Sequence, residues 1–176
     1  MHNYVFIACS LDGYIARKDG NIDWLNDIPN PDKSDFGYGS FIRKIDAVVM
    51  GRKTYEKVLT FTHWPYVKPA FVLSNTLKTV PPYLKSKIEI ISGDLREAME
   101  MLEARKLNSF YIDGGITIQN FLKEDLIDEM IITRLPVLLG DGLPLFGPMN
   151  SELKFKHELT EVLHNTIVQS RYKRIR

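Results

Sequence analysis

Short apolar runs alternate with helix-like stretches along most of this chain, and no other feature constrains the fold as strongly. The runs have the length of buried strands, while the stretches between them carry apolar residues at helical spacing. Such an order predicts an α/β protein with a mostly parallel sheet. The predicted strands are Tyr4–Cys9, Asp46–Met50, Ala70–Ser74, Ile88–Ile91, Phe110–Ile112 and Ile127–Thr133, and the predicted helices are Lys33–Lys44, Arg52–Leu59, Gly93–Lys106 and Thr117–Lys123.

The C-terminal stretch has a different pattern, which predicts an antiparallel hairpin at one edge of the sheet. Phe155, Leu159 and Leu163 have strand-like spacing, and Asn165 can turn the chain back into a last strand, 167–175. Three apolar residues of that last strand could join two copies of the chain in a homodimer: Ile167, Val168 and Tyr172.

The composition excludes several classes of protein. A formal net charge of +1 over 176 residues gives no basic face for nucleic acid. Cys9, the one cysteine, lies in an apolar run, so we expect no disulfide and a cytoplasmic location. No apolar run is long enough to cross a membrane, and the four histidines lack the spacing of a zinc site, so we expect no metal. No linker divides the chain, which predicts one domain over residues 1–176.

The stretch Gly51-Arg52-Lys53-Thr54 follows a predicted buried strand and opens a predicted helix. A helix start presents free backbone N–H groups and the positive end of the helix dipole, and both attract phosphate. Arg52 and Lys53 add positive charge, and Gly51 lets a ligand approach the backbone closely. The pattern indicates a phosphate site, and its alternative is an ordinary solvated helix start.

A second junction of this kind is Gly114-Gly115, between the strand 110–112 and the helix that follows. It exposes amides beside a permissive backbone, as a pyrophosphate site requires, although it lacks the G-x-G-x-x-G pattern of dinucleotide-binding proteins. The alternative is a tight strand-to-helix turn. In a parallel sheet both junctions lie at the carboxyl ends of strands, where ligands bind.

A third strand end, Ser74-Asn75, carries no acidic residue. An acid at such a position binds the free ribose of NAD, whereas small polar groups near cations suit a 2′-phosphate. This difference favours NADPH over NADH as the cofactor.

The loop of residues 10–30 contains Asp12-Gly13 and then the apolar Tyr14-Ile15-Ala16. Such a loop could close over a ligand as a lid. The alternative is a structural excursion that buries Ile15 and Trp24.

In combination, these stretches resemble the dihydrofolate reductase-like family, in the branch of the C-terminal reductase domain of the bifunctional riboflavin-pathway deaminase-reductase. The resemblance implies a three-layer α/β fold, whose mixed, mostly parallel sheet ends in an antiparallel C-terminal hairpin, and NADPH as the cofactor. It spans nearly the whole chain in the same order, through residues 10–16 (SLDGYIA), 46–56 (DAVVMGRKTYE), 112–115 (IDGG) with Phe121-Leu122, 130–133, and 138–147 (LLGDGLPLFG).

The resemblance also implies a set of cofactor contacts and a cis peptide bond between Gly114 and Gly115. The Ala8 backbone would contact the nicotinamide carboxamide, and Ile15 and Ala16 would lie along the nicotinamide. The phosphates would be held by Gly51, Arg52, Lys53 and Thr54, the adenosine 2′-phosphate side by Ser74 and Asn75, and the pyrophosphate by Gly114, Gly115, Ile116 and Thr117.

The sequence departs from true dihydrofolate reductases where those enzymes carry a catalytic acid. No acid directly follows Trp24-Leu25, and Asp27, Asp32 and Asp35 compete for the role. We predict Asp35, at the entry of the helix 33–44, as the proton donor, and a helix-cap role is its alternative. The family's three consecutive glycines are also reduced here to Asp113-Gly114-Gly115.

These features predict an NADPH-dependent reductase that transfers a hydride to a C=N or C=O carbon of a small heterocycle, either pterin-like or a ribosyl-pyrimidine. One alternative is the 5-amino-6-(5-phosphoribosylamino)uracil reductase of riboflavin biosynthesis. A second alternative is a nucleotide-binding protein that keeps the fold without turnover.

Overall fold

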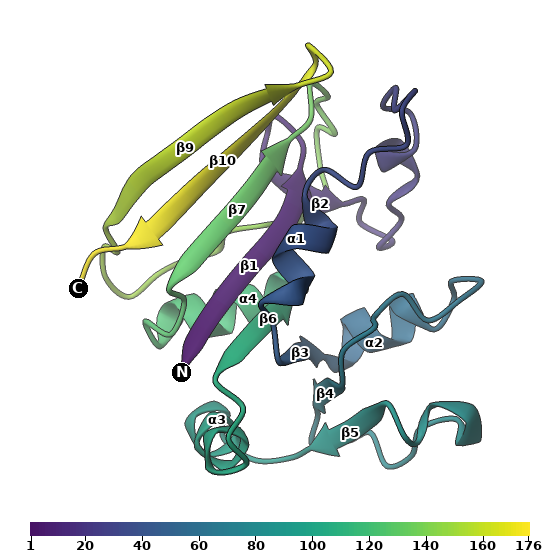
Figure 1. Ribbon diagram of the computed structural model, residues 1–176, viewed down its shortest axis with the longest axis vertical. Helices are drawn as coiled ribbons and strands as arrows, with labels where there is room; N and C mark the ends of the chain where they lie inside the picture. Colours follow the sequence, from purple (N-terminus) through teal and green to yellow (C-terminus); the bar gives the residue numbers. More distant parts are fainter.

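The computed structural model describes all residues, 1–176, and is organised around one large mixed sheet (Figure 1). Its eight strands have the order β5-β4-β3-β6-β1-β7-β10-β9, in which the pairs from β5 to β7 are parallel and the last two pairs are antiparallel. The strands are β1 His2–Cys9, β3 Ala47–Gly51, β4 Ala70–Leu73, β5 Ile88–Ile91, β6 Ser109–Asp113, β7 Glu129–Arg134, β9 Phe155–Leu163 and β10 Ile167–Arg174.

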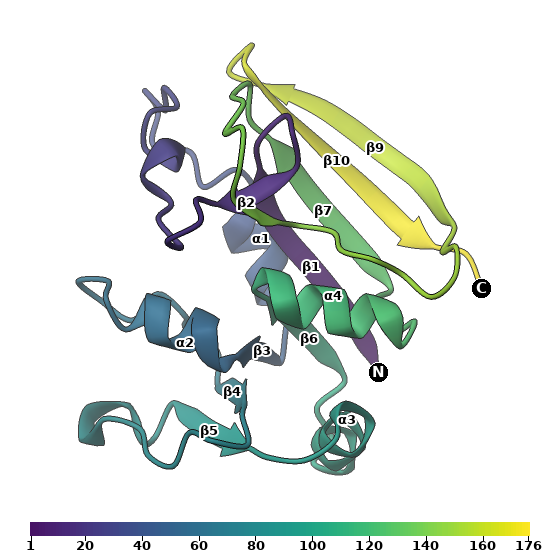
Figure 2. The same cartoon turned by 180° about the vertical axis from the view of Figure 1, so that it is seen from behind.

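Helices cover both faces of the sheet, which makes three layers (Figures 1 and 2). α1 Tyr38–Arg43 and α2 Arg52–Val58 pack on one face, whereas α3 Leu95–Ala104 and α4 Gly115–Lys123 pack on the other. Because strand side chains alternate between faces, neighbouring residues of one strand enter different apolar clusters. None of the helices is both long and apolar enough to cross a membrane.

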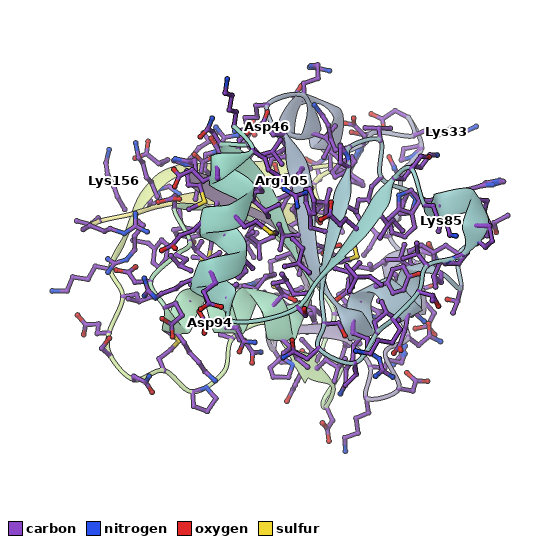
Figure 3. The ribbon with its side chains drawn as sticks, turned by 90° about the horizontal axis from the view of Figure 1, so that it is seen from below. Lys33, Asp46, Lys85, Asp94, Arg105 and Lys156 are labelled. Atoms are coloured by element: carbon purple, nitrogen blue, oxygen red, sulfur yellow. The ribbon has the colours of Figure 1, made fainter.

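Short elements complete the fold. β2 Tyr14–Ala16 and β8 Leu143–Pro144 form a second, two-stranded sheet, and β2 lies inside the segment 10–30 that we predicted as a loop. Two 3-10 helices are η1 Asp23–Leu25 and η2 Pro82–Leu84. Asp94, at one end of α3 in Figure 3, accepts a hydrogen bond from the Arg96 amide and so caps the helix N-terminus.

The predicted α/β fold, with its antiparallel C-terminal hairpin, is confirmed, and two local expectations were wrong. The helix expected over 33–44 begins only at Tyr38, because Gly37 has a left-handed backbone (φ 86°) that an α-helix cannot contain. No cis peptide bond occurs, so the bond between Gly114 and Gly115 is trans. The chain turns there instead through the positive φ of Gly114 (92°).

The C-terminal hairpin turns where the sequence predicted, since both His164 and Asn165 adopt left-handed backbone. Ile167, however, is 1% exposed and packs with Trp24 and Leu135 inside the chain. It therefore cannot join two copies as we expected, whereas Val168 is 39% exposed. The homodimer itself stays a prediction.

Neighbouring residues of β10 offer a stability test of this assignment. Ile167→Ala should lower the free energy of unfolding by about 2–5 kcal/mol, because it removes buried methyl groups and leaves a cavity. Val168→Ala, at an exposed position, should change it by less than about 0.5 kcal/mol. Urea unfolding followed by circular dichroism measures both. Equal losses would contradict the burial of Ile167.

Candidate functional site

The sheet opens at its carboxyl edge between β1 and β6. β6 pairs only with His2–Tyr4 of β1, whereas β7 pairs with β1 from Tyr4 to Cys9. The Tyr111 hydroxyl bridges the widening gap by donating to the Phe6 carbonyl oxygen at 3.0 Å. Ala8 therefore has β7 as its one neighbour in the sheet. An opening of this kind, at the carboxyl ends of parallel strands, is where ligands bind in open α/β sheets.

The two predicted phosphate junctions interlock beside this opening. β3 and β6 are paired, with Met50 opposite Asp113, so the two strands end together. A methyl group on Gly51 would lie 2.8 Å from Thr117 Oγ1, and one on Gly114 would collide with Thr54 Oγ1. The absence of side chains at these two glycines thus lets the starts of α2 and α4 pack directly against each other.

Arg52 extends from this junction to the loop after β4. Its Nε donates to Glu56 Oε1 at 2.6 Å, and its guanidinium donates to Thr76 Oγ1 at 2.8 Å. Ser74 Oγ accepts from the Thr76 amide at 3.2 Å, while Asn75 Oδ1 accepts from a backbone N–H beyond β5. Thr76, which the sequence reasoning missed, is therefore the residue of this loop that contacts Arg52. The sequence could have indicated Thr76, because its hydroxyl group directly follows Ser74-Asn75.

The remaining predicted cofactor residues surround the same edge. Thr117 and Ala16 are buried, Lys53 is exposed, and Ile116 is 57% exposed at the start of α4. The contacts therefore bring together the segments 51–54, 74–76 and 114–117. Ala8 lies on β1 beside the opening.

The loop 10–30, predicted as a possible lid, lies with a second loop, 138–147, against the start of α4. Ile15 lies so close to Gly115 that a methyl group there would be 2.7 Å from its Cδ1. The Asp12 carboxylate ties this loop to the other one by accepting from the amides of Leu139 (3.2 Å) and Gly140 (2.8 Å). A hydrogen bond from Ser10 and these amide bonds lower the pKa of Asp12. The carboxylate thus stays ionised and holds the two loops together.

Asp35 has the contacts of a helix cap. Its Oδ1 accepts from the Gly37 amide at 2.9 Å and its Oδ2 from the Gly39 amide at 2.8 Å, at the start of α1. These bonds lower the pKa of the exposed Asp35, whereas a general acid at neutral pH needs a raised one. Asp32 lies 3.3 Å from His164 at the hairpin turn. The proton-donor role of Asp35 stays a prediction that these contacts do not support.

Asp113 has the electrostatics that Asp35 lacks. It ends β6 beside the opening, and the Tyr66 hydroxyl donates to its Oδ2. Burial raises the pKa of Asp113, and hydrogen bonding, first of all from Tyr66, offsets only part of the rise. Burial, together with this carboxyl, raises the pKa of Tyr38 to about 12. The sequence showed Asp113 only as a departure from three glycines, since its tyrosine partners come from distant segments.

The chain matches a known protein family over almost its whole length. The model of the RibD C-terminal domain matches residues 3–169. This chain belongs to the RibD C-terminal domain family. The matched range contains every segment of the candidate site, so the interlocked junctions, the lid loops and Asp113 all lie within the family's domain.

Solved structures of similar proteins support the family and the fold. A Shewanella sp. PV-4 protein, provisionally named for riboflavin biosynthesis, is 51% identical, with each chain fully covered and a TM-score of 0.97. The Thermotoga maritima diaminohydroxyphosphoribosylaminopyrimidine deaminase/5-amino-6-(5-phosphoribosylamino)uracil reductase is 18% identical, with a TM-score of 0.77 over 99% of this chain and 56% of its own. Dihydrofolate reductase from Enterococcus faecalis is 15% identical, with a TM-score of 0.64 over 98% and 96% of the two chains. The last two show the fold, which is dihydrofolate reductase-like.

Two glycines with positive φ test the interlocked junctions. Gly13→Ala introduces only the backbone strain of φ 84°, because nothing lies within 4 Å of the new methyl group, and should cost about 1–2 kcal/mol. Gly114→Ala adds a collision with Thr54 and should cost about 3 kcal/mol or more. Urea unfolding measures both. Thr54→Ala should recover part of the Gly114→Ala loss, and no recovery would argue against direct contact.

Proposed function

We propose that this protein is an NADPH-dependent reductase that delivers a hydride to a small heterocyclic substrate, pterin-like or a ribosyl-pyrimidine. The observation that carries the proposal is the position of Asp113, a partly buried acid with a raised pKa, directly beside the interlocked junctions in a RibD C-terminal domain. The Thermotoga and Shewanella proteins are named for uracil reduction and riboflavin biosynthesis. Their names make 5-amino-6-(5-phosphoribosylamino)uracil the first substrate to test.

The chain's residues fit a dinucleotide phosphate. Gly114 and Gly115 carry no side chains where α4 begins, so its first amides could donate to a pyrophosphate. Arg52 and Lys53 supply positive charge at the neighbouring junction. The hydrogen bond from Arg52 to Thr76 holds the guanidinium toward the loop after β4, where it could bind a 2′-phosphate. When bound, NADPH would supply the hydride.

Asp113 would supply the proton. Its Oδ2 accepts from Tyr66, so the proton of the neutral acid belongs on Oδ1. Tyr66 thereby fixes which oxygen can donate to a substrate. Burial favours the neutral acid at a pH where an exposed carboxyl is ionised, which is the requirement for a general acid near neutrality.

Cofactor preference tests the role of Arg52. Loss of a charge-assisted hydrogen bond, worth roughly 1.5–3 kcal/mol, should weaken NADPH binding about 10- to 100-fold in Arg52→Ala and leave NADH nearly unchanged. Arg43→Ala, on α1, is the matched control, because Arg43 hydrogen-bonds Ser40 of its own helix and lies outside the two junctions. Titration calorimetry with both cofactors gives the ratio. Equal affinity of the wild type for NADPH and NADH would contradict the assignment.

The two candidate acids are separated by the same conservative change. Asp113→Asn should retain NADPH affinity but lose about 10²–10⁴-fold in turnover, measured as substrate-dependent NADPH oxidation. Asp35→Asn should keep turnover and lose only one of its two capping bonds. The reverse result would restore Asp35 as the donor. If the protein binds NADPH tightly but oxidises it with no pterin or ribosyl-pyrimidine substrate, the result would favour the alternative of a nucleotide-binding protein without turnover.

The pH dependence of stability gives an independent reading of Asp113. A carboxyl whose folded pKa is raised stabilises the fold below its ordinary value of 3.8 and loses that contribution as pH rises through the folded pKa. Asp113→Asn cannot ionise, so it should unfold at a higher temperature than the wild type at neutral pH. That advantage should shrink as pH falls. A constant difference across pH would mean that Asp113 has an ordinary pKa.

A further inference from the structure

A cavity of about 340 Å³ lies between the loop after α2 and η2, and it shares no residue with the candidate site. This loop and η2 run side by side at the same end of the molecule in both ribbon views (Figures 1 and 2). Its volume lies within the roughly 300–1,000 Å³ of ordinary small-molecule sites. The lining residues that carry its chemistry are Phe61, His63, Trp64, Tyr83 and Lys87.

Aromatic side chains give this cavity its shape. Tyr83 is 72% exposed and Phe61 is 38% exposed, so large ring surfaces remain uncovered at its mouth. The Trp64 ring lies further in and packs against Tyr55 and Tyr66 at centroid distances of 6.3 and 5.2 Å. Rings arranged in this way bind another planar ring by stacking or edge contact.

Two buried hydrogen-bond donors beside the cavity lack partners. The Trp64 Nε1 and Tyr55 hydroxyl groups are both buried without a hydrogen bond, and Tyr55 is only 1% exposed. Tyr83, which lines the cavity, lies near enough to contribute to the raised pKa of Tyr55. An unpaired buried polar group is costly, so a ligand that brings an acceptor atom to Nε1 of Trp64, the one of the two that lines the cavity, would be favoured.

The cavity lining carries one permanent charge, which is positive. Lys87 supplies it, and no Asp or Glu lines the cavity. An anionic group on the ligand would therefore meet a cation without repulsion from a carboxylate.

We propose that this cavity binds a small planar aromatic anion, that is, one or two fused rings bearing a carboxylate or phosphate group. The ring would contact Tyr83, Phe61 and Trp64, and the anionic group would pair with Lys87. This second site does not depend on the reductase assignment. It is nevertheless adjacent to the reductase site, because Trp64 packs against Tyr66, which bonds Asp113.

The chain carries its own reporter for the test. Trp24 and Trp64 are its two tryptophans, so Trp24→Phe leaves Trp64 as the single indole fluorophore, inside the proposed site. Benzoate and phenyl phosphate, titrated in the absence of cofactor, should each change the Trp64 fluorescence with saturation in the micromolar to millimolar range. Benzyl alcohol, cyclohexanecarboxylate and inorganic phosphate should bind at least about tenfold more weakly, since each lacks the charge or the ring.

Exposed residues supply variants that keep the fold. Tyr83→Ala and Lys87→Gln should each weaken benzoate about fivefold or more, measured by the same titration. Lys85→Gln is the matched control, because exposed Lys85 follows η2 at the periphery of the molecule and does not line the cavity (Figure 3). Saturable binding lost in both variants but kept in the control supports the proposal. No saturable binding, equal binding of benzyl alcohol, or binding unchanged in both variants would overturn it.

Discussion

The close contact between two strand-to-helix junctions is the constraint on which this molecule depends. β3 and β6 end together, and the missing side chains of Gly51 and Gly114 let Thr117 and Thr54 fill the space between them. This packing brings the first backbone amides of α4 and the guanidinium group of Arg52 close together. Larger residues at either glycine would separate the two helix starts and disrupt the proposed anion-binding surface without changing a charged group.

At the same edge of the sheet, the burial of Asp113 lowers the stability of the fold but also gives the carboxyl a raised pKa. Burying a carboxyl is unfavourable, and the chain offsets part of the penalty with hydrogen bonds from tyrosine and backbone donors. The remaining penalty appears as a raised pKa, which keeps the group protonated where exposed acids are ionised. The chain thus keeps a buried carboxyl that lowers its stability but can hold a proton. Such a loss of stability is common at functional sites.

The lid is fixed by a different kind of interaction. Asp12 is exposed and ionised, and it holds the loops 10–16 and 138–147 together through backbone amides. Those bonds lie on the surface, whereas Ala16 and Leu145 of the same loops are buried, so the loops are also held by apolar packing against the core. Ile15 then becomes the point at which the lid meets the backbone of Gly115.

The sequence by itself determined the order of the main strands and helices, the C-terminal hairpin and the strand-to-helix junctions at one edge of the sheet, because apolar periodicity, glycine and charge act over a few neighbouring residues. Only the tertiary structure decided which residues meet across the sheet. It showed that Thr76 contacts Arg52, that Ile167 is buried, and that Asp35 caps a helix while Asp113 lies among tyrosines. Burial and its effect on pKa depend on partners far apart in the chain, which local patterns do not encode.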